Sequence, residues 1–398
     1  MPQYLTPGVY VEEVPSAIQP IAGVGTSTAG FIGTVAQDVT MPLIPGRSGV
    51  KADGTTKEPA DFYTRAADGK AVLVTSWDVF QRNFGKLGAG NSVLGNAVYG
   101  FFNNGGSRCW VTSVADIATV ENVKAALTGF AAIYEIAIVA VPGAVSAAVQ
   151  NAVLDHCENQ YTQDRFAILD GQPTTTLTKA GIQQCRDSSY GAVYYPWIDL
   201  GLKGSDGAVV YQPPSGHIAG VYARVDTQRG VFKAPANEVI RGALGVQTLL
   251  SKADQAGLNP DGVNVIRQFG TNTTIWGART MGGAEDPEWT YISSRRLFLY
   301  LRDSIDRGTQ WAVFEPNGPD LWSKIRRNVG AFLTTVWESG ALLGDTAAQA
   351  FYVRCDETTN PPEIRNLGQL VTEVGVALVS PAEFVVFRIS QWSGPASS

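Results

Sequence analysis

The chain is poor in charged residues and in the residue types that carry most enzyme chemistry. Charged residues make up 17% of its 398 residues, against about 25% in a typical soluble domain. Much of the surface must therefore be uncharged, which favours wide contacts with other subunits. The sequence contains only two histidines and four cysteines, so histidine-based catalysis and metal binding have few possible positions.

Long runs of like charge and long apolar runs are also missing. The 36 acidic and 30 basic residues give a net charge of -6, which argues against nucleic acid as a partner. No apolar run approaches the roughly 18 residues that span a bilayer, and residues 1–5 lack the features of a signal peptide. We therefore expect synthesis in the cytosol and no direct membrane insertion.

The cysteines show no metal-binding or disulfide pattern. Cys109, Cys157, Cys185 and Cys355 are far apart and form no CxxC pair. Such cysteines are typical of reduced, mostly buried thiols rather than of a zinc site or a disulfide framework. Of the 30 basic residues 20 are Arg, a residue favoured over Lys at interfaces.

Nucleotide-binding and nucleophile motifs are not found. The two Gly-Lys pairs, at 69–70 and 85–86, lack the following Ser or Thr and the glycine five positions earlier that a P-loop requires. The glycines of residues 23–30 miss the dinucleotide spacing and are better explained by tight strand packing. Residues 25–29 lack the second glycine of a nucleophile elbow. We predict no cofactor.

The two histidines have no evident catalytic companions. His156 precedes Cys157 and Glu158 within a helical pattern, and no PCxxC follows as in zinc deaminases. We interpret it as a helix-surface or boundary residue. His217 is expected on a loop, as a hydrogen-bonded residue without metal-ligand neighbours. The sequence therefore predicts no catalytic or metal-binding residue and a protein that is not an enzyme.

The central part of the chain alternates between helices and short apolar strands. Continuous apolar strands separated by helices predict a largely parallel sheet that is covered on both faces. Residues from about 38 to 68 lack periodicity and are rich in Gly, Pro and Asp, which indicates an exposed insertion or hairpin. The predicted helices span residues 77–84, 92–103, 120–134 and 145–161, and the predicted strands 22–33, 109–114, 136–141, 165–170 and 192–198.

The last hundred residues predict a smaller α+β domain. A helix is expected over 291–307 with Gly308 as its C-cap, and a second helix over 321–337 is stopped by Gly340. Two strands follow, over 350–356 and 370–379. Residues 295–327 carry a net charge of +3 (seven basic and four acidic residues), so the second helix could face an acidic partner or present solvated charges.

Two extended segments with period-two patterns lie at opposite ends of the chain. Residues 7–15 and 383–390 each alternate side chains of unlike character, and Pro7, Pro15 and Pro381 bound them. A terminal strand is stable only when added to a sheet, either in its own subunit or in a neighbouring one. The pattern alone leaves both possibilities open.

A resemblance follows from a series of motifs that runs in order over almost the whole chain. The sequence closely resembles the sheath proteins of contractile phage tails and of bacterial contractile injection systems. The motifs that carry the resemblance are PGVYVEEV, STAGFIG, FFNNGGSRCWV, YYPWI, PPSGHIAGVYARVDTQRGVFKAPAN, LNPDGVNVIRQFG, WGARTM, YISSRRLFLYLRDSI, WAVFEPN, LWSKIRRNVGAFLTTVWESGAL, FYVRCDETTN and SPAEFVVFRISQ.

The resemblance implies a domain organisation. It comprises an amino-terminal linker arm (1–20), an outer α/β domain (21–285) with the insertion at 38–68, an inner α+β sheath domain (286–380) and a carboxy-terminal linker arm (381–398). Both arms are implied to exchange strands with adjacent subunits. The residues implied in this exchange are Val9, Tyr10, Val11, Glu12, Glu13, Val14, Phe384, Val385, Val386, Phe387, Arg388, Ile389 and Ser390. The family's tube-facing helix matches the segment with Lys324, Arg326 and Arg327, for which we expect contacts with the inner tube.

The resemblance also implies a mechanical function. Six-membered rings are expected to stack into a sheath around an inner tube, and contraction to a more stable assembly would drive the tube through a target envelope. Baseplate and tail terminator or cap proteins are further expected partners. Assembly is expected in the bacterial cytoplasm, within a phage virion or a phage-tail-like injection particle. The alternatives are an α/β enzyme and a monomeric binding module, either of which would be a monomer with a titratable small ligand.

Overall fold

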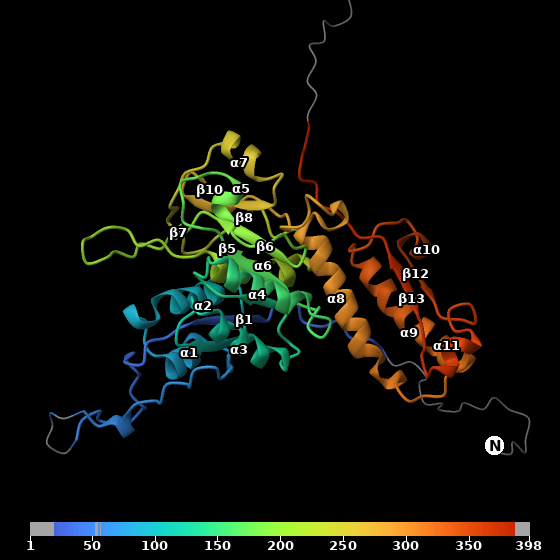
Figure 1. Cartoon of the computed structure of the whole chain (residues 1–398), viewed down its shortest axis with the longest axis horizontal. Coiled ribbons are helices and arrows are strands. Elements are labelled where there is room, and N and C mark those ends of the chain that lie inside the picture. Colours follow the sequence, from blue (N-terminus) through green and yellow to red (C-terminus); the bar gives the residue numbers. More distant parts are fainter. Residues whose placement is uncertain (1–19, 52–54, 56, 387–398) are drawn as a thin grey trace, which may run out of the picture. The chain divides into compact units, whose positions relative to one another are not determined.

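The computed structural model describes residues 20–51, 55 and 57–386, and the chain forms two compact units (Figure 1). Of the described residues, 24–300 and 379–386 belong to the larger unit, and 20–23 and 301–378 to the smaller one. The chain passes from the larger to the smaller unit within helix α8 (Ile292–Thr309). The domain limits predicted at 285 and 380 stay predictions.

The larger unit contains a mixed nine-stranded sheet of order β2-β3-β1-β4-β5-β6-β10-β11-β8. The six strands from β3 to β10 are parallel, and β2, β11 and β8 are antiparallel additions at the edges. The predicted fold class is thereby confirmed. The strands are β1 (Ala29–Thr34), β2 (Val72–Val74), β3 (Cys109–Val114), β4 (Ile138–Ala140), β5 (Phe166–Asp170), β6 (Gly191–Tyr195), β8 (Glu238–Val239), β10 (Val263–Phe269) and β11 (Asn272–Ile275), with β7 (Ile198–Asp199) and β9 (Gly245–Val246) as a separate pair.

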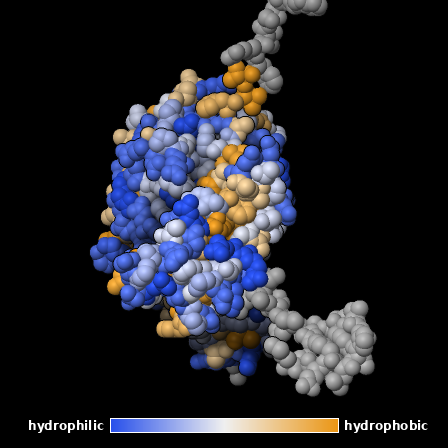
Figure 2. Space-filling model, turned by 90° about the vertical axis from the view of Figure 1, so that its right-hand side faces the viewer, coloured by the Kyte–Doolittle hydropathy of each residue, from blue (hydrophilic) through white to orange (hydrophobic). Residues whose placement is uncertain are grey.

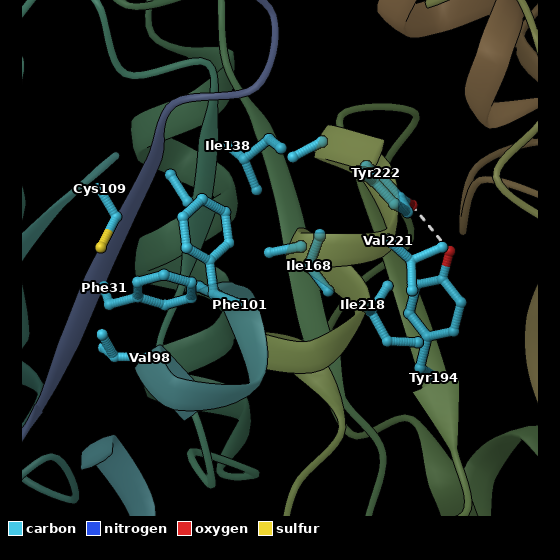
Figure 3. Close-up of a cluster of buried hydrophobic side chains, with 14 of the residues drawn as sticks. Phe31, Val98, Phe101, Cys109, Ile138, Ile168, Tyr194, Ile218, Val221 and Tyr222 are labelled. Atoms are coloured by element: carbon cyan, nitrogen blue, oxygen red, sulfur yellow. Dashed lines mark hydrogen bonds between the residues drawn. The ribbon is translucent and has the colours of Figure 1, made fainter. Parts of the chain in front are cut away.

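Helices cover both faces of this sheet because the parallel strands are apolar on both sides. Phe31 of β1 and Ile168 of β5 belong to one hydrophobic core, whereas their neighbours Ile32 and Leu169 belong to the other. This alternation follows from the two-residue period of a strand. Figure 3 shows the first core, in which Tyr194 and Tyr222 are joined through their hydroxyl groups at 2.7 Å. The helices are α1 (Trp77–Phe84), α2 (Ser92–Asn104), α3 (Val120–Ala131), α4 (Ala147–Glu158), α5 (Lys179–Ile182), α6 (Ser215–Arg229) and α7 (Lys252–Leu258).

Helices α2 and α6 pack so closely that glycine is required at their crossing. A Cβ atom on Gly216 would lie 2.5 Å from backbone atoms of Ala97, and one on Gly220 would lie 2.4 Å from the carbonyl oxygen of Phe101. Only a residue without a side chain allows the two backbones to approach this far. Gly216 and Gly220, four residues apart on one side of α6, therefore reflect helix packing.

The smaller unit combines helix α9 (Pro319–Glu338) with a two-stranded antiparallel sheet of β12 (Phe351–Arg354) and β13 (Glu373–Val376). Short helices α10 (Ala347–Ala350) and α11 (Pro362–Asn366) flank β12. Apolar residues recur along one side of α9 and are buried, among them Ile325, Val329 and Leu333. Helices packed with a small antiparallel sheet confirm the predicted small α+β arrangement.

Most predicted elements are confirmed within a few residues, and four details were wrong. The strand predicted over 22–33 begins only at Ala29, as β1. His217 lies in α6 with 2% of its surface exposed, not on a loop. Gly308 lies inside α8, where a Cβ atom would meet Ile21 at 2.5 Å, and is not its C-cap. The single strand predicted over 192–198 is two short strands, because Pro196 follows the end of β6 and cannot donate a ladder hydrogen bond. In the insertion, Leu43 pairs with Phe62 and Val50 with Lys57, as in the expected hairpin.

Candidate functional site

Glu383 holds the start of the carboxy-terminal arm to the larger unit. Its carboxylate accepts hydrogen bonds from Arg279 Nε at 2.9 Å and Nη2 at 2.7 Å, from Asn259 Nδ2 at 2.7 Å and from the Tyr291 hydroxyl at 3.0 Å. These bonds favour the charged form and hold the pKa of Glu383 below its usual value even though burial opposes them. The side chains of Glu383 and Arg279 are 19% and 18% exposed, so this ion pair is partly shielded from water.

The residues directly after Glu383 are apolar and exposed. Phe384, Val385 and Val386 are each more than 70% exposed and belong to no strand of the described chain. Hydrophobic residues also gather at the top of the face shown in Figure 2. Three consecutive exposed apolar side chains indicate a surface that another chain covers. The other predicted exchange residues, 9–14 and 387–390, lie outside the described residues.

The two-stranded sheet of the smaller unit has open edges. Ala377 N donates to Ala350 O at 2.8 Å, so residues 350 and 377 form a hydrogen-bonded pair. Because such pairs alternate along an antiparallel ladder, residues 352 and 375 form the next one. The backbone groups of Val353, Val374 and Val376 therefore point away from the partner strand. They form no hydrogen bond with any other residue that the structure describes. An edge of this kind is a template for an added strand.

One face of the same sheet is apolar and only half-buried. Phe351 lies opposite Val376, and Val353 opposite Val374, so all four side chains share a face. Each of the four is half-buried, whereas the strand residues of the larger sheet's cores are almost fully buried. A two-stranded sheet is marginal by itself in water, and further strands would complete this one.

The three predicted tube-contact residues of α9 differ in their surroundings. Arg326 donates hydrogen bonds to the carbonyl oxygen of Cys355 and, at 3.2 Å, to Ser323 Oγ, so it ties the helix to the end of β12. Lys324 is half-buried and Arg327 is exposed, and neither forms a hydrogen bond or ion pair with a described residue. At a spacing of three they lie on the same side of the helix. The structure therefore separates one structural arginine from two available cations.

The histidines considered for catalysis lie in the folded core. The expectation that His217 is hydrogen-bonded was wrong, because its Nδ1 is buried without a hydrogen-bond partner among the described residues. Arg165 Nη1 lies 2.8 Å from His156 Nε2, and because arginine can only donate, the histidine must be the neutral acceptor. Burial, with the nearby Arg165 charge, lowers the pKa of His156 to about 4. Burial likewise lowers the pKa of His217 to about 4. All four cysteines are free and buried, as predicted, and burial raises the pKa of the Cys157 thiol to about 12.

Asp170, at the end of β5, is a buried acid that the sequence did not single out. It accepts hydrogen bonds from the backbone of Gly143 and from the backbone and hydroxyl of Ser215, and burial raises its pKa to about 6. Its partners are the first residue of α6 and a turn, so it fixes the start of that helix. In the described part of the chain, no three His, Cys, Asp or Glu side chains form a metal-binding group. No described helix is long and apolar enough to cross a bilayer.

Comparisons with known proteins agree with this architecture. Residues 117–281 match the family model of the phage tail sheath protein central domain, and residues 284–391 match that of the phage tail sheath C-terminal domain. The chain belongs to the contractile tail sheath protein family. It is 26% identical over 240 residues to a putative prophage major tail sheath protein of Pseudomonas aeruginosa (strain UCBPP-PA14). The matched region covers 57% of this chain and 58% of that protein.

Two solved structures are similar over nearly the whole chain. A chain of the sheath complex of PVC, an extracellular contractile injection system, in the contracted state has a TM-score of 0.74 and 27% identity, and the match covers 99% of both chains. A chain of the six-fold symmetrised anti-feeding prophage baseplate has a TM-score of 0.73 and 28% identity, and the match covers 98% of this chain and 99% of that one. The fold is therefore that of contractile sheath subunits, and the family is structural rather than enzymatic.

Proposed function

We propose that this protein polymerises as stacked hexameric rings around an inner tube, and that contraction of the resulting sheath drives the tube through a target envelope. The observation that carries the proposal is the match of nearly the full chain to a subunit of a contracted injection-system sheath. The baseplate match supports a contact with baseplate proteins at one end of the sheath. A terminator or cap protein is the expected partner at the other end, and assembly takes place in the bacterial cytoplasm.

Strand exchange supplies the connections of the proposed lattice. The arms of residues 9–14 and 384–390 add to the open edges of the β12–β13 sheet in neighbouring subunits. The outward backbone groups of Val353, Val374 and Val376, and the half-buried apolar face beside them, support this acceptor. Each added ladder hydrogen bond contributes only about 1 kcal/mol net. Several per arm, repeated through the lattice, keep subunits connected while they rotate.

Contraction in this proposal needs no nucleotide. The extended sheath is a metastable assembly, and rigid-body rotation to a state with more buried area between the larger units releases the free energy. His156 already has a partner in Arg165, and His217 is buried with 2% of its surface exposed, which supports a structural rather than an enzymatic role. The tube contact is assigned to Lys324 and Arg327, the two α9 cations without a described partner, and to Arg326 as their support.

Truncation tests the strand exchange. A chain that ends at Glu383, and one that lacks residues 1–15, should stay soluble but should not form striated tubes in negative-stain electron microscopy. The full chain should form them. Normal tubes from either truncated chain would overturn the role of that arm.

Proline substitutions test the proposed acceptor edge. V374P removes a backbone donor that points away from β12, so the subunit keeps its own ladder but loses an added strand. V353P tests the opposite edge in the same way. V374T keeps the donor and is the matched control, which should assemble normally. Tubes formed equally well by V353P, V374P and V374T would contradict this acceptor.

A further inference from the structure

A single side chain attaches the start of the carboxy-terminal arm. Among the described residues 379–386, Glu383 forms the only hydrogen bonds to another described residue. The residues after it are exposed. The path of the arm away from the larger unit is therefore decided at this one position.

The receiving site for Glu383 is built without it. Arg279 and Tyr291 face each other in an antiparallel bridge, flanked by backbone hydrogen bonds from Thr280 N to Thr290 O at 2.9 Å and from Ile292 N to Ala278 O at 3.0 Å. Arg279 N also donates to Asn264 Oδ1 at 2.7 Å, and Asn264 is fully buried. Asn259 directly follows α7 and donates its backbone N–H to Gln255 O. The side chains of Arg279, Tyr291 and Asn259 therefore project from backbone positions that other hydrogen bonds already fix.

An exposed ion pair contributes little to stability, but the pair between Glu383 and Arg279 is not of this kind. Exposed pairs are worth about 0–1 kcal/mol because water competes for both partners. Here a planar guanidinium binds the carboxylate through two nitrogens, and two neutral donors fill its remaining acceptor positions, so both position and orientation are set.

We propose that Glu383 is the positioning residue of the carboxy-terminal arm, a latch that fixes the point and direction from which the arm leaves its own subunit. Without it the next attachment is Leu378, which pairs with Leu342 in an isolated antiparallel bridge, so the freely moving chain grows by five residues, about 17 Å when extended. Its consequence for assembly rests on the proposed strand exchange. A directed arm meets one neighbour, whereas a free arm can fold back or reach a wrong one.

Distance measurement in the unassembled subunit tests the latch directly. Nitroxide labels on V385C and K252C report the distance from the arm to α7 by pulsed electron paramagnetic resonance, and the four native cysteines are buried. The otherwise native chain should give a narrow distribution. E383A should broaden it by roughly 15 Å, the spread of a free tether of seven residues, and E383Q should fall between the two.

The control is E373Q, which breaks the exposed pair between Arg354 and Glu373 on β13, whose side chains are 57% and 50% exposed. It should leave the distribution unchanged. An unchanged distribution in E383A would overturn the latch whatever the assembly result. Broadening together with fewer or shorter tubes supports it, while broadening with normal tubes would overturn its role in assembly. Normal tubes from the chain that ends at Glu383 would instead contradict the strand exchange and leave the distance result standing.

Discussion

Arg296 and Asp226 form a buried bidentate ion pair in the larger unit. Arg296 Nη1 and Nη2 donate to the two carboxylate oxygens at 2.9 and 2.6 Å, and both side chains are less than 5% exposed. Arg296 also donates to the carbonyl oxygen of Thr26, and its guanidinium lies 4.6 Å from the centre of the Tyr222 ring. The first turns of α8 are thereby tied to α6 and to the chain before β1.

Removing one partner of this pair should destabilise the subunit strongly. D226A leaves a buried cation without its counter-ion, and we expect a loss of about 3–5 kcal/mol in the free energy of unfolding. The double variant D226A/R296M should lose less than D226A alone, because it buries no unpaired charge. Urea unfolding followed by circular dichroism measures both. If the stability loss of the double variant equalled the sum of the losses of D226A and R296M alone, the coupling between the two residues would be contradicted.

Two helical glycines should respond to alanine in opposite directions. G220A places a methyl group against the backbone of Phe101 in α2, and we expect a loss of about 1–3 kcal/mol in the free energy of unfolding from overpacking. G330A in α9 meets no atom within 4 Å, so it should gain about 0.5–1 kcal/mol from the better helix propensity of alanine. Thermal unfolding of both proteins provides the measurement. A stable G220A protein would show that α2 and α6 can move apart.

Acid should destabilise the subunit through its buried histidines. The pKa values of His156 and His217 fall to about 4 in the folded state, so below an ordinary pKa near 6.5 the unfolded chain binds protons first. Their contribution to the free energy of unfolding is complete above that value and is lost as the pH falls toward 4. H156Q keeps a hydrogen-bond acceptor for Arg165 but does not titrate. It should lose less stability than the native chain between pH 7 and pH 4.5 in urea unfolding.

Asp170 should act in the opposite direction. Its folded pKa is raised to about 6, so its carboxyl group takes up a proton in the folded state first, and stability from this group rises as the pH falls from 6 toward 4. D170N removes this compensation. The loss of stability on acidification should be steeper in D170N than in the native chain, and an unchanged slope would show that Asp170 does not titrate in this range.

Substitutions of the α9 cations should affect either sheath assembly or the stability of the subunit, depending on the residue. K324E/R327E should leave the free energy of unfolding nearly unchanged and prevent sheath assembly around the tube protein, because neither side chain has a described partner to lose. R326A should lower stability by about 1–2 kcal/mol, through the lost hydrogen bond to the carbonyl oxygen of Cys355. Co-sedimentation with the tube protein and urea unfolding separate the two. Normal co-assembly by K324E/R327E would rule out this tube contact.

The periodicity of apolar residues and the backbone conformations open to glycine made much of the fold predictable. The apolar strands such as β3 and β5 could be recognised because both of their faces are buried, and the end of α9 because Gly340 takes a positive φ of 84°. His217 was placed wrongly because it follows two prolines and a glycine, which usually indicate a loop. The packing of α6 against α2 outweighed that local preference.

The candidate site was only partly predictable for a related reason. The exposed apolar residues 384–386 and the cations of α9 are local patterns, so the sequence reveals them. The role of Glu383 is not local, since Arg279 lies 104 residues away. The same holds for Arg326. The sequence does not distinguish it from Lys324 and Arg327, and only the structure shows its hydrogen bond to the carbonyl oxygen of Cys355.

The sequence by itself determined most elements, their order and the alternating side-chain pattern of both ends, because these depend on periodicity and backbone preference over a few residues. Only the tertiary structure decided which strands neighbour each other, which edges of the small sheet stay open and which charge holds the arm. Those depend on residues far apart in the chain that come together only when the apolar faces pack.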